Sequence, residues 1–381
     1  MVRRRSMALH VSVWRHERGS RWHEFRSAVS LHAHTSYSRE ALVDLPRYLV
    51  QIPFVGSRVE RELRTECAID FSKGWWHPPV TAREVFDSES AQIADRLQLM
   101  PIVSLSDHDD LRAGLDVQQV QDVGRAPISF EWTVPYGPGY FHLGIHNLPP
   151  VGAADWFARL SAFTAQPDSA ALAALLGELQ ACREVLTVFN HPWWDLADVG
   201  ATTHTAMLDH FLRAHGNRLH ALELNGYRSQ AENDRVRTLA AEVELPVISG
   251  GDRHGCAPNA LLNLTAASTF AEFAEEVRGG CSRVLIMPEY RQHLLLRTLA
   301  SASDVMRHYP WRPEGQYWTD RVSYEANGLR PLSDVWPHGG PFWVRSSVRV
   351  LHLLTSPLLR PMVGVAFRTM NTTLADEVVR A

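Results

Sequence analysis

Short apolar runs in this chain repeatedly end in histidine, aspartate or glutamate, the residue types that commonly bind metal ions. Of all features of the sequence, this pattern constrains the fold most strongly. Nine such residues follow strand-like runs: His32, His34, His108, Glu131, His142, His191, Glu223, Asp252 and His254. Because side chains alternate along a strand, two ligands separated by one residue lie on the same face. Imidazoles and carboxylates converging from several strands suit borderline divalent cations. The pattern predicts a metal centre at the strand ends of an α/β fold.

Apolar strands alternate with helical stretches between about residues 28 and 290, which predicts a largely parallel sheet or barrel. The helices are predicted at 81–97, 153–165, 169–182, 203–215, 229–244 and 269–278. Residues 1–27 form an N-terminal segment, and residues 291–381 are predicted to be a mainly helical extension. Residues 45–80 are a long insertion, which is typical of a lid or a substrate-binding element.

Composition indicates which kinds of binding partner and which cellular compartment to expect. The net charge of −4 gives no basic footprint for long nucleic acids, and no run of about 18 apolar residues predicts a membrane span. The four cysteines are far apart and form no CxxC pair: Cys67, Cys182, Cys256 and Cys281. We therefore expect a reduced, cytoplasmic protein that acts on a small molecule without a membrane. The sequence does not indicate an oligomeric state.

Strand alternation sharpens some of these assignments. In the run ISFEWTV, Glu131 lies on the polar face, opposite Phe130 and Trp132. In YFHLGIHNL, His142 and His146 share a face, so periodicity does not choose between them. For Glu223, contact with a metal ligand or with substrate is as reasonable as metal binding itself.

The chain resembles the PHP (polymerase and histidinol phosphatase) superfamily. The matching motifs are HAHTSYS from His32, SDH at 106–108, Glu131, His142, NHP at 190–192 and GGDRH at 250–254. Together they cover residues 28–290 in the family's order. The resemblance implies a distorted, TIM-like (β/α)7 barrel with two or three divalent cations, usually manganese, zinc or iron. It also implies phosphoester hydrolysis.

The resemblance further implies which cation each residue binds. His32, His34 and Asp252 would bind the first cation, and Glu131 would bridge it to the second. His142 and His191 would complete the second site.

A third site, formed by His108 with His254, is also implied, but one position departs from the family. Relatives usually carry an acid directly after the serine of the first motif, where this chain has Arg39 followed by Glu40. A guanidinium repels a cation. Either Glu40 replaces the missing acid, or Arg39 supplies positive charge and binds phosphate in a bidentate manner; we favour the second interpretation.

We expect cleavage of a small phosphomonoester or phosphodiester by a hydroxide that bridges two cations. Glu131, His254, Arg253 and Arg39 are the candidate catalytic residues. His254 would protonate the leaving group if no third cation binds. Phosphate contacts are expected from Arg39, Tyr227, Arg228 and Arg253.

Two other functions remain open. An amidohydrolase-type barrel would cleave C–N bonds with a similar set of ligands. Many such enzymes bridge their metals with a carbamylated lysine on a strand, whereas the only lysine here, Lys73, lies in the insertion. A catalytically silent barrel could serve as a binding or scaffold module, although only one expected ligand position is changed.

Overall fold

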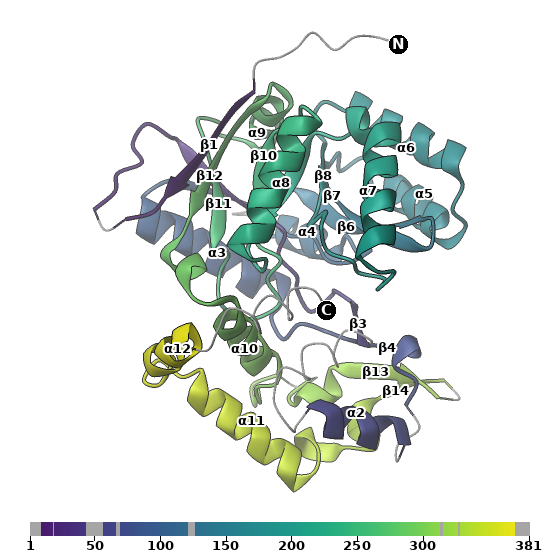
Figure 1. Cartoon of the computed structure of the whole chain (residues 1–381), viewed down its shortest axis with the longest axis vertical. Coiled ribbons are helices and arrows are strands. Elements are labelled where there is room, and N and C mark those ends of the chain that lie inside the picture. The colour runs from purple at the N-terminus through teal and green to yellow at the C-terminus, as the bar shows by residue number, and fades with distance from the viewer. Residues whose placement is uncertain are drawn as a thin grey trace. The chain divides into compact units, whose positions relative to one another are not determined.

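A computed structural model describes residues 9–17, 19–42, 56–65, 69–120, 126–312, 315–326 and 328–369. Its chain divides into two compact units (Figure 1). Residues 1–34, 82–253 and 258–291 form the first unit, and residues 35–81, 254–257 and 292–381 form the second. The segment expected to be an insertion and the C-terminal extension thus belong to the same unit.

One sheet of the first unit has the strand order β1-β12-β11-β2-β5. Its strands are β1 (His10–Arg15), β2 (Ser27–Leu31), β5 (Met100–Ser104), β11 (Leu261–Thr265) and β12 (Cys281–Ile286). Strand β2 pairs in parallel with β5 and antiparallel with β11. The sheet is therefore mixed rather than largely parallel.

The other sheet of the first unit has the order β10-β9-β8-β7-β6. Its strands are β6 (Ile128–Tyr136), β7 (Gly139–Leu148), β8 (Leu186–Phe189), β9 (Ala221–Asn225) and β10 (Val247–Gly250). Strands β8, β9 and β10 are parallel, and β7 is antiparallel to both of its neighbours. Two isolated parallel bridges, Ala33 to Arg253 and His108 to Glu131, extend from ends of the two sheets.

The helices of the first unit are α3 (Ala82–Leu97), α4 (Arg112–Gln118), α5 (Ala153–Ala165), α6 (Ser169–Ala181), α7 (Ala201–His215), α8 (Gln230–Glu242) and α9 (Phe270–Arg278). The six predicted helices are confirmed within about two residues at each end. As the predicted cap of α8, Ser229 accepts a hydrogen bond from the Glu232 amide at 3.1 Å. Side chains of helices α5 to α8 and of the β6–β10 sheet share one hydrophobic core.

The second unit contains a four-stranded sheet of order β14-β13-β4-β3. Its strands are β3 (Glu40–Ala41), β4 (Gly74–Trp76), β13 (Val322–Glu325) and β14 (Leu329–Pro331), and its helices are α2 (Gly56–Thr65), α10 (Leu294–Val305), α11 (Phe342–Leu354) and α12 (Arg360–Thr369). Short 3-10 turns connect them. The extension is thus mainly helical but also contributes two strands.

The described part of the expected insertion is built into this second unit. Strand β4 pairs with β13, and Leu63, Ile69 and Trp76 are buried in the core of the unit. A lid would instead keep few buried contacts. The prediction of a lid is therefore wrong for 56–65 and 69–80, while 43–55 and 66–68 lie outside the described residues.

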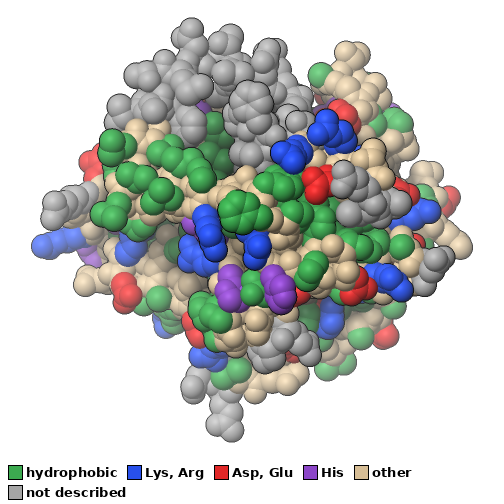
Figure 2. Space-filling model, turned by 90° about the horizontal axis from the view of Figure 1, so that it is seen from below, with side chains coloured by type: hydrophobic (Ala, Val, Ile, Leu, Met, Phe, Trp, Pro, Cys, Tyr) green, Lys and Arg blue, Asp and Glu red, His purple; other side chains and the backbone are tan. Residues whose placement is uncertain are grey.

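Several apolar side chains of the last two helices and of the turn between them are exposed, including Phe342, Leu353, Leu358 and Met362. Figure 2 shows hydrophobic side chains at the surface beside arginine and histidine side chains. Within the described residues, no helix is both long enough and apolar enough to cross a membrane. Among the described residues, Cys182, Cys256 and Cys281 form no disulfide bond, and Cys67 is outside the described residues.

Candidate metal centre

The Glu131 carboxylate is the centre of a buried histidine cluster in the first unit. Glu131 is fully buried on β6. Its Oε2 lies 3.1 Å from His32 Nε2, 3.5 Å from His34 Nε2 and 3.1 Å from His108 Nδ1. Its Oε1 lies 3.1 Å from His191 Nε2 and 3.3 Å from His142 Nδ1. Each carboxylate oxygen thus faces its own group of imidazoles.

Asp252 adds a second carboxylate to one side of this cluster. Its Oδ1 lies 3.6 Å from His32 Nε2 and 3.4 Å from His34 Nε2. Three groups of side chains each place one ligand atom per residue within 4.8 Å of the others: His32, His34 and Glu131; His32, His191 and Asp252; His108, Glu131 and His142. The structure therefore brings together seven of the eight predicted ligands.

The backbone is strained at three of these positions. His32, His191 and Asp252 have φ angles of 60°, 27° and 53°, in the left-handed region that non-glycine residues rarely adopt. Such conformations cost about 1–3 kcal/mol each and persist where the surrounding structure enforces them. Here they turn side chains at the ends of β2, β8 and β10 toward Glu131.

Burial and charge act in opposite directions on the pKa values of the cluster. Burial lowers the pKa of His32, but Glu131, Glu223 and Asp252 together raise it well above its usual value. Burial raises the pKa of Glu131, but the neighbouring histidines hold it well below its usual range. The Glu131 carboxylate therefore favours its ionised form and attracts positive charge.

The cluster fits a pair of divalent cations. His32 Nε2, Glu131 Oε2 and His142 Nδ1 are buried, and their close contacts of 3.1 and 3.3 Å lack the geometry of hydrogen bonds within the described residues. Leaving buried polar atoms without hydrogen bonds costs about 1–3 kcal/mol each. Cations bound between the imidazoles and carboxylates would satisfy these atoms.

Glu223 holds the cluster in place rather than adding to it. Its Oε1 lies 2.5 Å from His32 Nδ1, the ring nitrogen that faces away from Glu131. Its Oε2 accepts hydrogen bonds from the His191 amide at 2.9 Å and from Asn225 at 3.0 Å. A Cβ at Gly250 would lie 1.7 Å from Glu223 Oε1, which explains a glycine there. Of the roles left open by the sequence, the orientation of a ligand is favoured.

Two asparagines complete the arrangement and were not predicted from the sequence. Asn190 Nδ2 donates to Glu131 Oε1 at 2.9 Å, and Asn225 Nδ2 lies 3.2 Å from Asp252 Oδ2. Asn190 precedes His191 and Asn225 follows Glu223 by two residues, so each stands in a motif already singled out. Their position at strand ends was the available signal.

His146, the alternative to His142, has a different environment. Its Nδ1 lies 2.9 Å from Ser104 Oγ, and burial lowers its pKa to about 3. It is absent from the three groups of candidate ligands. The choice of His142 agrees with this geometry.

Arg253 is not placed to hold a phosphate group. The side chain is buried, with Nη1 2.7 Å from Glu89 Oε1 and 2.8 Å from Ser88 Oγ. A guanidinium already paired with a buried carboxylate cannot leave it without a large cost. This corrects the predicted phosphate-binding and catalytic role of Arg253.

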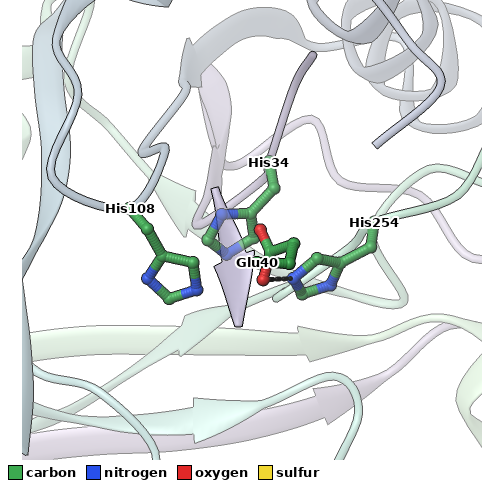
Figure 3. Close-up of side chains that lie close together, drawn as sticks. All are labelled: His34, Glu40, His108 and His254. Carbon is green, nitrogen blue, oxygen red and sulfur yellow. Dashed lines mark ion pairs between the residues drawn. The ribbon is translucent and has the colours of Figure 1, made fainter. Parts of the chain in front are cut away.

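Arg39 also differs from its predicted role. Its side chain is exposed and lies over the Trp75 ring at 5.2 Å, within the second unit. The neighbouring Glu40 is buried and pairs with His254, with 3.0 Å between Oε2 and Nε2 (Figure 3). Glu40 is therefore the acid associated with His254, the interpretation that the sequence did not favour.

The residues predicted for the third site and for phosphate binding have different surroundings. The His34 and His108 rings are stacked 4.6 Å apart in the first unit (Figure 3). Arg228 lies 3.4 Å over the Trp194 ring, which contacts the His191 ring at 5.1 Å. Tyr227 is half-buried. The third site would pair His108 of the first unit with His254 of the second, and it stays a prediction.

Comparisons with known proteins place the chain among no described family. No family model and no curated protein match it. Solved structures with weak similarity include an amidohydrolase from Chromobacterium violaceum with bound sulfate and no metal, a protein named as a metal-dependent phosphoesterase from Bifidobacterium adolescentis, and PsfC from Pseudomonas syringae. Their sequence identities are 15%, 17% and 14%, with TM-scores of 0.35, 0.34 and 0.35. The alignments cover 59%, 53% and 72% of this chain, and 87%, 92% and 96% of the respective neighbours.

Proposed function

We propose that this chain is a metal-dependent hydrolase that cleaves small phosphate esters, with a PHP-type centre of two divalent cations. The observation that carries the proposal is the buried Glu131 carboxylate, whose two oxygens face separate groups of histidines. A pair of bound divalent cations would activate water and neutralise charge on a phosphoryl group. Manganese, zinc and iron all suit the imidazole and carboxylate donors.

The proposed fold is a distorted (β/α)7 barrel. In support, the bridge from His108 to Glu131 connects the end of β5 to β6, and the bridge from Ala33 to Arg253 connects the end of β2 to that of β10. The seven strands β2, β5, β6, β7, β8, β9 and β10 would then form a ring. Chemistry in such barrels occurs at the C-terminal ends of strands, and His32, His191 and Asp252 lie just after β2, β8 and β10.

The residues of the chain would divide the work as follows. His32, His34 and Asp252 would hold one cation and His142 with His191 the other, while Glu131 would bridge them. Arg228, which lies 3.4 Å over the Trp194 ring and 3.7 Å from Glu232 Oε1, would be a candidate to contact a phosphate oxygen. Tyr227 is the neighbouring candidate for substrate contact.

A C–N hydrolase is the second candidate, but one observation disfavours it. Lys73 is 61% exposed and lies 3.8 Å from Asp70 on a 3-10 turn of the second unit. It is not on a strand of either sheet that carries the cluster. A carbamylated lysine bridge therefore has no residue to form it.

A substrate panel tests the proposal. The protein, loaded separately with Mn²⁺, Zn²⁺ or Fe²⁺, should hydrolyse p-nitrophenyl phosphate or bis-p-nitrophenyl phosphate but not p-nitroanilide amides. Glu131→Gln should abolish this activity, and Glu242→Gln, which changes an exposed glutamate of α8, should not. Turnover of the amides alone would favour the second candidate. Turnover of neither class would contradict the proposal.

A further inference from the structure

A buried ion pair outside the proposed metal ligands joins Glu89 of α3 to Arg253, the residue that follows Asp252. Both side chains are at most 1% exposed, and Oε1 and Nη1 are 2.7 Å apart. Glu89 also accepts hydrogen bonds from Ser30 Oγ at 2.9 Å and from the Asn259 amide at 3.0 Å. None of these residues is a proposed metal ligand.

Arg253 connects this pair to two ligands at once. It follows Asp252 in the chain, and its carbonyl accepts a hydrogen bond from the His34 amide at 2.9 Å. The Asp252 amide in turn donates to the His32 carbonyl at 2.6 Å. The backbone around Arg253 therefore fixes Asp252 beside both histidines of the first motif.

The Glu89 network holds the same two strand ends from the other side. Ser30 precedes the HxH motif by two residues, and Asn259 Nδ2 donates to Ser30 Oγ at 2.8 Å and to the Leu31 carbonyl at 2.9 Å. A Cβ at Gly251 would overlap Asn259 Oδ1 at 1.6 Å, so the segment before Asp252 packs directly against this network. One carboxylate thus connects the end of β2 to the end of β10.

Stability alone is a poor explanation for such a pair. A buried ion pair gains little over well-packed apolar side chains, although removing one partner is costly because it leaves a buried charge. Fixed geometry is the better-supported benefit at this place. In addition, the Glu89 carboxylate neutralises a guanidinium that would otherwise add positive charge beside a centre meant for cations.

We infer that Glu89 is a positioning residue, which acts through Arg253 to hold Asp252 against His32 and His34 and so sets the affinity of the first cation site. This inference rests on the proposed function, because it presupposes that these residues bind metal. Residues that orient metal ligands typically contribute 10–100-fold to affinity.

Calorimetric titration of Mn²⁺ into the metal-free protein tests the inference. Glu89→Gln keeps a similar shape but removes the charge, and it should weaken one of two binding events by about 10-fold or more. Glu89→Asp, which keeps the charge on a shorter side chain, should give a smaller loss and provides a second folded variant. Restoring charge balance with Glu89→Gln/Arg253→Gln should not restore affinity, because the connection is still missing.

The matched control is the ion pair of Arg96 and Glu289, which includes a residue of the same helix and lies at the surface with a distance of 2.9 Å. Arg96→Gln/Glu289→Gln should leave both Mn²⁺ affinities unchanged. If the Glu89 variants melt at lower temperature but bind Mn²⁺ as the unmodified protein does, the role is purely structural and the inference is wrong. If the unmodified protein binds no metal, the proposed function itself fails.

Discussion

The buried metal-binding residue types of the first unit and the buried Arg321 of the second unit differ in their hydrogen-bond partners. In the first unit, imidazoles and carboxylates crowd around Glu131, and several of their buried atoms make no hydrogen bond within the described chain. In the second unit, the buried Arg321 donates to the carbonyls of Gly315, Gln316, Val305 and Arg307. Its positive charge is spread over backbone acceptors that belong to the fold.

This difference separates a binding site from a structural support. Groups that stay without partners in a well-packed interior reduce stability, so their clustering points to a ligand that satisfies them. Groups that donate to backbone carbonyls, as the two Nη atoms of Arg321 do, hold loops in place. Changes in the first set should therefore alter metal binding more than folding, and changes in the second set the reverse.

The largest expected effect is that of Glu131→Gln. An amide carries no charge to share between two cations, so the affinity for metal should fall by more than about 100-fold, beyond the loss typical of residues that only orient ligands. Metal content after dialysis, measured by elemental analysis, provides the test. Full metal content in this variant would remove Glu131 from the centre.

A smaller loss is expected for Glu223→Gln. The variant still fills the space beside Gly250, but it weakens the contact with His32 Nδ1 and the charge that raises the pKa of that ring. We expect metal affinity to fall by about 10–100-fold while the fold is retained. Unchanged affinity would show that the orientation of His32 does not depend on Glu223.

Arg321→Met should act on stability instead. It leaves several buried carbonyls without their donor, which should lower the free energy of unfolding by about 2 kcal/mol. Metal affinity of the first unit should not change. Denaturant unfolding measures the free energy of unfolding, and calorimetry on the same preparation measures the metal affinity. A parallel loss of metal affinity would contradict the proposed difference between the two units.

His146 gives a pH-dependent test of burial. Its pKa is lowered to about 3 by burial, so between that value and the ordinary 6.5 the unfolded chain binds a proton that the folded chain does not. Stability should therefore fall on acidification through this window, by up to about 1.4 kcal/mol per pH unit from this group. Unfolding of the metal-free protein should depend less on pH in His146→Gln. An equal dependence would mean that His146 is protonated in the fold.

The smallest effect is expected for Arg39→Asp. Because Arg39 is exposed over Trp75, the substitution should change neither the number of bound cations nor KM. An increase of one bound cation would restore the role that the sequence suggested. Glu40→Gln is the informative partner variant, since Glu40 is the carboxylate beside His254.

The sequence predicted the candidate metal ligands better than the residues that hold those ligands in place. The histidines and Glu131 stand within or shortly after strands, where alternation and local motifs make them visible. Glu89 lies in the middle of a helix, and its partner Arg253 is far away in sequence, so no local pattern connects them. Arg253 and Arg39 were misassigned for the same reason, because a charge in a motif does not show what it contacts.

The same limit applies to the fold. The helices followed from periodicity and capping, as Ser229 illustrates. The pairing of β4 with β13 joins residues about 250 positions apart, and nothing in the Trp75–Trp76 run specifies that partner. Without this pairing, the run was interpreted as part of a lid.

Anomalous diffraction from crystals grown with Mn²⁺ tests the central claim most directly. Two anomalous peaks are expected on either side of the Glu131 carboxylate, one beside His32, His34 and Asp252 and the other beside His142 and His191. The same crystals of Glu131→Gln should lose at least one peak. The absence of any peak at Glu131 in the unmodified protein, with Mn²⁺ in excess, would contradict it.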